Sequence, residues 1–271
     1  MLWLYPFERG FFCDDESIHY PYKESTVTNG ILLVVSITVP ILTVCGMEWW
    51  KIYNNKVIQK LKIWGYKIHP LIWTIVHKLG PFWFGFFANI MFTYIIKYTI
   101  GRLRPHFIAV CDPDWSQIQC TTSELHQTYV DPIPCTAEDK YRIKEARMSF
   151  PSGHSSVSAF AMVYVVMYLQ MQHKLFYHRL LRSVFQILCL SFTVYTSVSR
   201  IHDYRHHWSD SLGGFLLGTI VAILTFYYAS DLLPDKDILI SYHAQSRVIP
   251  LQEYQPNPDE KNKNSIHPDQ S

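Results

Sequence analysis

A dense group of ionisable side chains occupies residues 199–210, which read Ser-Arg-Ile-His-Asp-Tyr-Arg-His-His-Trp-Ser-Asp. Two arginines, three histidines and two aspartates stand here between two apolar segments. Ionisable residues at the edge of an apolar segment are usually retained for a function, because they are costly to bury. Taken alone, the stretch fits a metal site, a phosphate site or a basic collar at a membrane surface.

Histidine and aspartate recur in this stretch at a spacing suited to covalent catalysis. His206 and Asp210 are four residues apart, or one helical turn, so the carboxylate can accept a hydrogen bond from one ring nitrogen and fix the tautomer. The other nitrogen can then attack phosphorus and form a phosphohistidine. His207 is a competing nucleophile, with Asp203 four residues before it. His154 is the candidate general acid for the leaving oxygen.

Three fixed positive charges could bind the anion on which such a histidine acts. The candidates are Lys97, Arg104 and Arg200, and arginine presents a planar donor fork that suits phosphate oxygens. Ser152 and Gly153 precede an apolar segment, and the free amides at a helix start also favour an anion. An alternative for Lys97 and Arg104 is that they reach toward the lipid surface. Together the five residues predict a site for a phosphoryl group.

Five apolar segments must position these residues. Only 17% of the 271 residues are charged, below the roughly 25% usual in soluble domains. Each segment lacks Lys, Arg, Asp and Glu and approaches the ~17–25 residues that cross a bilayer as a helix. The segments are 25–47, 79–96, 155–172, 183–199 and 211–230. We therefore expect an all-α fold, a polytopic membrane helix bundle with five transmembrane helices.

The alternation of these spans brings the ionisable residues to one membrane face. One side of the membrane carries the end of the second span, the start of the third, the end of the fourth and the start of the fifth. The residues at these ends are Lys97, Arg104, His154, Arg200, His206 and Asp210. The loops 48–78 and 173–182 lie on the other side and hold nine Lys or Arg, which assigns that side to the cytoplasm.

Four of the six cysteines fall on the face opposite the cytoplasm. They are Cys13, Cys111, Cys120 and Cys135. An extracellular or lumenal location permits disulfides. Four cysteines allow three pairings, and the sequence does not choose among them.

Three regions follow from this topology. Residues 1–24 form an extracellular or lumenal head, residues 25–232 form the membrane domain with 97–154 as its outer loop, and residues 233–271 form a cytoplasmic tail whose composition predicts disorder. We expect the plasma membrane, with an endomembrane as the alternative. No aromatic-interleaved basic stripe is present, so no nucleic-acid partner is expected. A homo-oligomer is compatible with the sequence.

Three motifs in this order resemble the signature of the type 2 phosphatidic acid phosphatase superfamily. They read Lys, six residues, Arg-Pro at 97–105; Pro-Ser-Gly-His at 151–154; and Ser-Arg, five residues, His, three residues, Asp at 199–210. Longer stretches, such as Gly-Arg-Leu-Arg-Pro-His-Phe and Asp-Tyr-Arg-His-His-Trp-Ser-Asp, look like the animal lipid phosphate phosphatase branch. The resemblance covers roughly residues 8–232.

The resemblance implies a role for each motif residue. The phosphate-binding residues would be Lys97, Arg104, Ser152, Gly153 and Arg200. His206 would be the nucleophile, Asp210 its orienter and His154 the proton donor, with no metal and no other cofactor. The implied substrates are phosphatidate, lysophosphatidate, ceramide 1-phosphate and sphingosine 1-phosphate in the membrane. That branch has six spans, and residues 9–13 resemble the loop after its first, so the first span is expected to be absent here.

Other functions account for fewer of these residues. A metal-dependent hydrolase would use His154, His202, His206, His207 and Asp210, but no His-Glu-x-x-His motif is present and three nearby cations oppose a metal ion. A catalytically inactive lipid-binding or scaffold membrane protein is the alternative favoured by the absent span. A transferase to a lipid alcohol would use the same residues as a hydrolase. A transporter would hold its substrate near the midplane and not at one face.

Overall fold

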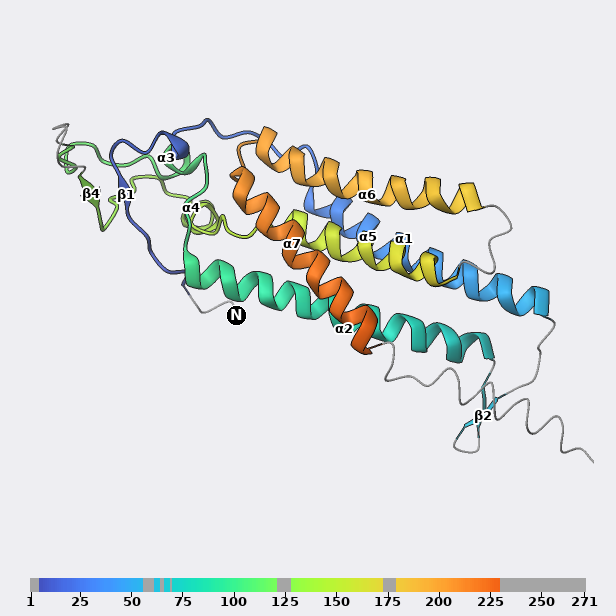
Figure 1. The fold of residues 1–271 in the computed structure, drawn as a ribbon. Coiled ribbons are helices and arrows are strands. Elements are labelled where there is room, and N and C mark those ends of the chain that lie inside the picture. Colours follow the sequence, from blue (N-terminus) through green and yellow to red (C-terminus); the bar gives the residue numbers. More distant parts are fainter. Residues whose placement is uncertain are drawn as a thin grey trace, which may run out of the picture. The chain divides into compact units, whose positions relative to one another are not determined.

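Five long helices pack into a bundle in the computed structural model (Figure 1). They are α1 (Asn29–Asn55), α2 (Pro70–Ile100), α5 (Gly153–Met171), α6 (Arg179–His202) and α7 (Trp208–Leu224), which continues into the π-helical turn η2 (Thr225–Ala229). Each predicted apolar segment corresponds to one of these helices. The expected all-α bundle is thereby confirmed.

The structure describes most of the chain up to the end of α7. The described ranges are 5–55, 61–63, 66–68, 70–120, 128–172 and 179–229. All of them belong to one unit, Met1–Ser230. The predicted tail at 233–271 lies outside the described residues.

Within the described residues, four helices are long and apolar enough to cross a membrane. The segments are Asn29–Lys51, Ile75–Ile100, Arg179–His202 and Trp208–Tyr228. The protein is accordingly a polytopic integral membrane protein. The remaining predicted span, α5, falls short in hydropathy because its first two turns carry His154 and three serines. The total of five spans stays a prediction.

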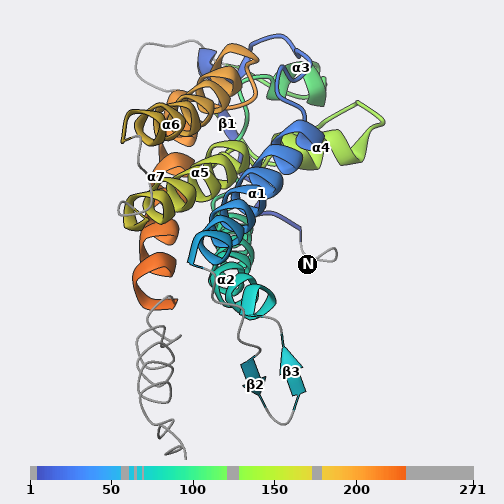
Figure 2. The ribbon, with the colours of Figure 1, turned by 90° about the vertical axis from the view of Figure 1, so that its right-hand side faces the viewer.

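The central position of α5 explains its polar start. Most of its side chains are buried, and it contacts α1, α2, α6 and α7 (Figures 1 and 2). A helix surrounded by other helices can carry serines, because neighbouring protein atoms, and not lipid, satisfy them. Thr93 on α2 and Ser156 on α5 illustrate this, with their hydroxyls 3.1 Å apart.

Two glycines let α7 approach α5 closely. A Cβ at Gly214 would collide with the carbonyl oxygen of Ser152, and one at Gly218 would collide with the carbonyl oxygen of Ser156. Small residues at such crossings allow two backbones to pack without intervening side chains. This contact places the start of α7 directly beside the start of α5.

A small head covers one end of the bundle (Figure 1). Its elements are η1 (Glu16–Ile18), α3 (Phe107–Cys111), α4 (Lys140–Ala146), and the antiparallel pair β1 (Phe11–Phe12) and β4 (Tyr129–Val130). Buried apolar side chains, Phe11 and Phe107 among them, form its core. Described residues of the predicted head, such as Phe11 and Ile18, therefore pack against residues of the outer loop, such as Phe107 and Val130.

Two disulfides lie within this head. Cys13 pairs with Cys120, and Cys111 pairs with Cys135, which selects one of the three pairings left open by the sequence. At the opposite end of α1 and α2, β2 (Leu61–Ile63) and β3 (Tyr66–Ile68) form a hairpin (Figure 2). The head and the hairpin thus lie at opposite ends, as the alternation of spans predicts.

Candidate active site

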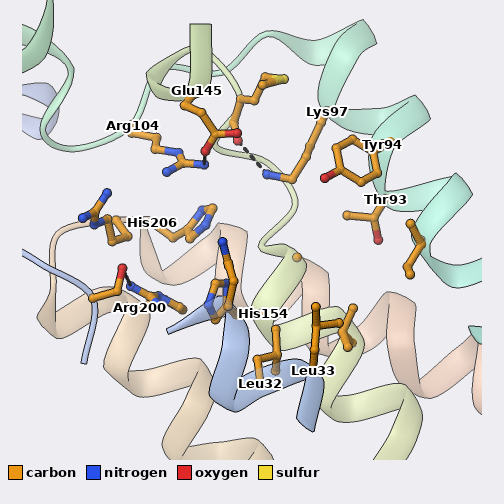
Figure 3. A pocket seen from close by; sticks show the side chains of 17 residues that line it. Leu32, Leu33, Thr93, Tyr94, Lys97, Arg104, Glu145, His154, Arg200 and His206 are labelled. Carbon is orange, nitrogen blue, oxygen red and sulfur yellow. Dashed lines mark hydrogen bonds and ion pairs between the residues drawn. The ribbon is translucent and has the colours of Figure 1, made fainter. Parts of the chain in front are cut away.

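A pocket of about 450 Å³ lies at the head end of the bundle, among the start of α1, the end of α2, the start of α5 and the end of α6 (Figure 3). Its ionisable lining consists of Lys97, Arg104, Glu145, His154, Arg200, Arg205 and His206. Its aliphatic lining consists of Leu32, Leu33, Ile90 and Val157. The pocket therefore suits a ligand with an anionic end and an apolar end.

Six of the eight site residues predicted from the sequence line this pocket. They are Lys97, Arg104, Gly153, His154, Arg200 and His206. The other two, Ser152 and Asp210, are fully buried. Figure 3 shows Lys97 and Arg104 across the pocket from Arg200. The predicted convergence of the three motifs at one end of the bundle is confirmed.

His206 lies close to Asp210 without a direct hydrogen bond. The distance from His206 Nδ1 to Asp210 Oδ2 is 3.9 Å, beyond hydrogen-bond range. The Ser149 hydroxyl donates to Asp210 Oδ2 at 2.5 Å and lies 3.4 Å from His206 Nδ1. Because α7 begins only at Trp208, His206 precedes the helix and the one-turn geometry expected from the spacing does not apply. Ser149 instead connects the two groups, and Nε2 is left for a ligand.

His207, the competing nucleophile, contacts the same carboxylate differently. It is the N-cap residue of α7, and both its Nδ1 and its backbone N–H lie 3.0 Å from Asp210 Oδ2. Its ring does not line the pocket. Asp203, the alternative orienter of His207, points to the N-terminal segment instead. The geometry therefore favours His206 as the histidine that faces a ligand.

Arg102 holds Asp210 from the other side, and the sequence reasoning did not single it out. Its Nη1 donates to Asp210 Oδ1 at 2.7 Å and to the Ser209 hydroxyl at 2.8 Å. A fully buried carboxylate requires such partners. The stretch Gly-Arg-Leu-Arg-Pro holds two arginines, Arg102 and Arg104, and nothing in their spacing shows which one faces the pocket.

Lys97 and Arg104 are already paired with protein oxygens on their side of the pocket. Lys97 Nζ donates to the Met148 carbonyl at 2.7 Å, and Arg104 Nη2 lies 3.2 Å from Glu145 Oε2. Burial lowers the pKa of Arg104, and Glu145 opposes that shift. Glu145, which no motif predicted, thus places one negative charge among the cations.

Arg200 is held by the segment that precedes α1. Its Nη1 donates to the Val27 carbonyl at 2.9 Å, and its Nη2 reaches the Ser25 hydroxyl and Asp203 Oδ2, each at 3.2 Å. Arg205 is a further cation in the lining that the sequence reasoning missed. Its only sequence signal was its position directly before His206.

The electrostatic surroundings favour a neutral His206. Burial holds the pKa of His206 well below its usual range, Arg104 and Lys97 lower it further, and Asp210 opposes the shift. A neutral imidazole keeps a lone pair on one ring nitrogen. His206 can therefore act as a nucleophile without first losing a proton.

The start of α5 is only partly open to an anion. Ser152 caps the helix by accepting the Ser155 N–H, and its own N–H donates to the Asp210 carbonyl at 2.9 Å. The Ser152 amide is therefore occupied in this structure, and Ser152 ties α5 to α7. Gly153 does line the pocket, so it is the better placed of the two predicted backbone donors.

The five residues of the metal-site alternative do not gather at one point. The His202 side chain is 76% exposed and lies near Asp203, whereas His154 Nε2 lies 3.1 Å from the Val27 carbonyl. Across the described ranges, no group of three or more His, Cys, Asp or Glu side chains is placed to hold a metal ion.

Comparison with known proteins gives a consistent result. A family model described as the PAP2 superfamily matches residues 78–233. Phospholipid phosphatase 1 of Mus musculus is 42% identical over 230 residues, which cover 85% of this chain and 78% of the relative. Phospholipid phosphatase 2 of Homo sapiens is 38% identical over 226 residues, covering 83% and 75%. No solved structure matches this chain.

Proposed function

The chain belongs to the PAP2 superfamily and is a membrane phosphatase, and on this premise we propose that it hydrolyses the phosphomonoesters of membrane lipids. The proposed substrates are phosphatidate, lysophosphatidate, ceramide 1-phosphate and sphingosine 1-phosphate. The names of its relatives support a phospholipid phosphatase activity.

The pocket lining is the single observation that carries this proposal. Four cationic side chains line the same pocket as Leu32, Leu33, Ile90 and Val157, which come from α1, α2 and α5. Leu33 is 43% exposed, so the apolar side of the pocket continues onto the outer surface of a membrane-spanning helix. A lipid phosphate has the matching two ends, whereas a small soluble phosphate ester would leave the apolar lining unused.

In the proposed first step, His206 Nε2 attacks phosphorus. A nitrogen–phosphorus bond forms, and the bond from phosphorus to the lipid oxygen breaks. His154, in its imidazolium form with both ring nitrogens protonated, gives one proton to that oxygen and becomes neutral, so the lipid leaves as a neutral alcohol. Lys97, Arg104 and Arg200 balance the charge on the transferred phosphoryl oxygens.

In the second step, water replaces the lipid. His154, which has lost its proton, takes one from water, and the hydroxide oxygen attacks phosphorus. The nitrogen–phosphorus bond breaks, inorganic phosphate leaves, and His206 is regenerated. We propose that fixed cations supply the charge stabilisation that Mg²⁺ supplies in other phosphoryl-transfer sites, so that no metal is required.

Phosphate release from phosphatidate in mixed micelles with excess EDTA tests the activity. We expect wild-type turnover in EDTA and none in His206→Ala. His19→Ala is the control, because His19 is an exposed histidine at the same end of the protein and lies outside the pocket lining. A strict need for added divalent metal would contradict the mechanism. Inactivity of correctly inserted wild-type protein towards all four lipids would favour the non-catalytic lipid-binding alternative.

Trapping of the intermediate tests the covalent step separately. Wild-type protein mixed with ³²P-labelled phosphatidate and quenched in alkali should carry an acid-labile label, because phosphohistidine is stable in base. The label should be absent from His206→Ala. Label in His206→Ala but not in His207→Ala would reassign the nucleophile. Adding a lipid alcohol and looking for a phosphorylated product separates hydrolysis from transfer.

The disulfides of the head support a proposal about the compartment. Both disulfides lie at the same end of the bundle as the pocket, and disulfides persist on extracellular or lumenal surfaces. We propose that the site faces the outside of the plasma membrane. Phosphate release from phosphatidate supplied to intact cells should then match the release after permeabilisation. Latent activity that appears only on permeabilisation would favour an endomembrane.

A further inference from the structure

A segment outside all three motifs completes the pocket. Residues 20–28, here called the N-terminal strap, run from the head to the start of α1. Tyr20 attaches the strap to the head, since its N–H donates to the Pro105 carbonyl at 2.9 Å. Further along, Tyr22 lies under the guanidinium of Arg205 at 4.3 Å, and Ser25 lines the pocket. The strap therefore touches the site at several points.

One backbone carbonyl of the strap contacts two residues of the site. The Val27 oxygen accepts a hydrogen bond from Arg200 Nη1 at 2.9 Å and lies 3.1 Å from His154 Nε2. A carbonyl oxygen can only accept, so the proton at this contact belongs to His154 Nε2. The Val27 carbonyl thus fixes both the ring of the proposed general acid and the fork of a phosphate-binding arginine.

Asp203 holds this part of the strap in place. Its Oδ2 accepts the Thr26 backbone N–H at 2.8 Å, and its Oδ1 accepts the Thr26 hydroxyl at 2.7 Å. The same carboxylate pairs with Arg200 Nη2 at 3.2 Å. Asp203 is 2% exposed, so these partners, together with the neighbouring His202, account for its buried charge. The peptide that it holds leads directly into Val27.

We propose that Asp203 is a positioning residue for the phosphatase reaction, acting through the N-terminal strap on His154 and Arg200. The inference rests on the proposed function, because it assigns a purpose to the geometry of those two side chains. Asp203 touches neither the substrate nor the reacting atoms: it is absent from the pocket lining. Asp203 sets the orientation of His154 and Arg200, the two groups that act on the substrate.

Inhibition by orthovanadate, a phosphate analogue, gives the most direct test. The inhibition constant does not depend on how much of a preparation is folded, so it separates positioning from a loss of folded protein. In Asp203→Asn, one carboxylate oxygen is replaced by a donor, so the two Thr26 bonds and the Arg200 pair cannot all be kept. We expect a rise in the inhibition constant, and in KM, of roughly tenfold or more, in line with the loss of a hydrogen bond to a charged group.

Matched strap variants identify the contact. Thr26→Val removes the hydroxyl at constant shape and should raise the inhibition constant. Thr26→Ser keeps the hydroxyl and should leave the inhibition constant at its wild-type value. Thr28→Val is the control, because Thr28 lies in the same strap and its hydroxyl accepts from the Ile31 N–H at the start of α1. Thr26→Val added to Asp203→Asn should cause little further change, since both act on one contact.

Each result bears on the proposal. An unchanged inhibition constant in both Asp203→Asn and Thr26→Val would overturn it, as would an equal rise in Thr28→Val. If wild-type protein shows no hydrolysis, the proposed function fails. Hydrogen exchange of the strap then tests separately whether Asp203 holds the strap in place. Deuterium uptake by residues 20–28 should increase in Asp203→Asn but not in Thr28→Val, and equal uptake in the two would contradict the attachment.

Discussion

The guanidinium of Arg102 forms a salt bridge with the carboxylate of Asp210, with 2.7 Å between Nη1 and Oδ1. The Asp210 side chain has no solvent exposure. Arg102 follows α2, and Asp210 lies in the first turn of α7. The bridge therefore connects the first and third sequence motifs next to His206, on the side away from the pocket. It provides the buried carboxylate with a countercharge that lies outside the pocket lining.

Arg102→Gln is expected to lower kcat by about ten- to hundredfold, because a buried carboxylate loses a charged hydrogen-bond partner. KM should change little, since Arg102 does not line the pocket. Arg9→Gln is the control: Arg9 is an exposed arginine outside the pocket lining and its replacement should be neutral. Steady-state kinetics on phosphatidate give both constants. A rise in KM alone would mean that Arg102 binds substrate.

Ser149→Ala should also lower kcat, by roughly tenfold, because the hydroxyl that connects Asp210 to His206 is removed. The ³²P-trapping assay reports this change as slower labelling of His206. Ser183→Ala is the control, since the Ser183 hydroxyl donates to the Arg179 carbonyl within its own helix. Unchanged labelling in Ser149→Ala would show that Asp210 orients His206 without the hydroxyl.

Glu145→Gln is expected to strengthen phosphate binding. Glu145 pairs with Arg104 inside the pocket and would repel an incoming phosphate dianion. Its side chain is 41% exposed, so solvent screening limits the gain to roughly two- to tenfold in the inhibition constant of inorganic phosphate. Glu138→Gln, an exposed change nearby, should have no effect. Weaker phosphate binding would instead show that Glu145 orients Arg104.

The helices could be predicted from the sequence because uncharged apolar segments of membrane-spanning length have few alternatives. The same reasoning could not place α5 at the centre. Its serines fit a buried helix as well as a lipid-facing one, and the choice depends on Gly214 and Gly218 of α7, which bring that helix against it.

The site could be predicted only as far as its motifs extend. Clustering at one end follows from the alternation of spans, but the direction of each side chain does not. Arg102 and Arg104 are two residues apart, yet one contacts Asp210 and the other lines the pocket. The contact of Asp203 with Thr26 joins positions 177 residues apart, and no local pattern encodes such a pairing.

His106 predicts how the stability of the head depends on pH. Its ring is 2% exposed, and its Nδ1 lies 2.7 Å from the Tyr204 carbonyl. Burial lowers the pKa of His106 from 6.5 to about 4; Arg104 and Arg205 act in the same direction, and the Tyr204 carbonyl opposes the shift. Between these two pH values the unfolded chain binds more protons at this site than the folded protein does, so the free energy of unfolding falls as the pH is lowered.

This single group should remove about 2 kcal/mol of stability between pH 7.5 and pH 5. Thermal unfolding in detergent at the two pH values measures the loss, and His106→Gln should make it smaller because glutamine does not titrate. His19→Gln, a change at an exposed histidine of the same head, serves as the control. If wild-type protein and His106→Gln lose the same stability between pH 7.5 and pH 5, His106 does not cause the pH dependence. The dependence would then have to come from other buried groups such as His206.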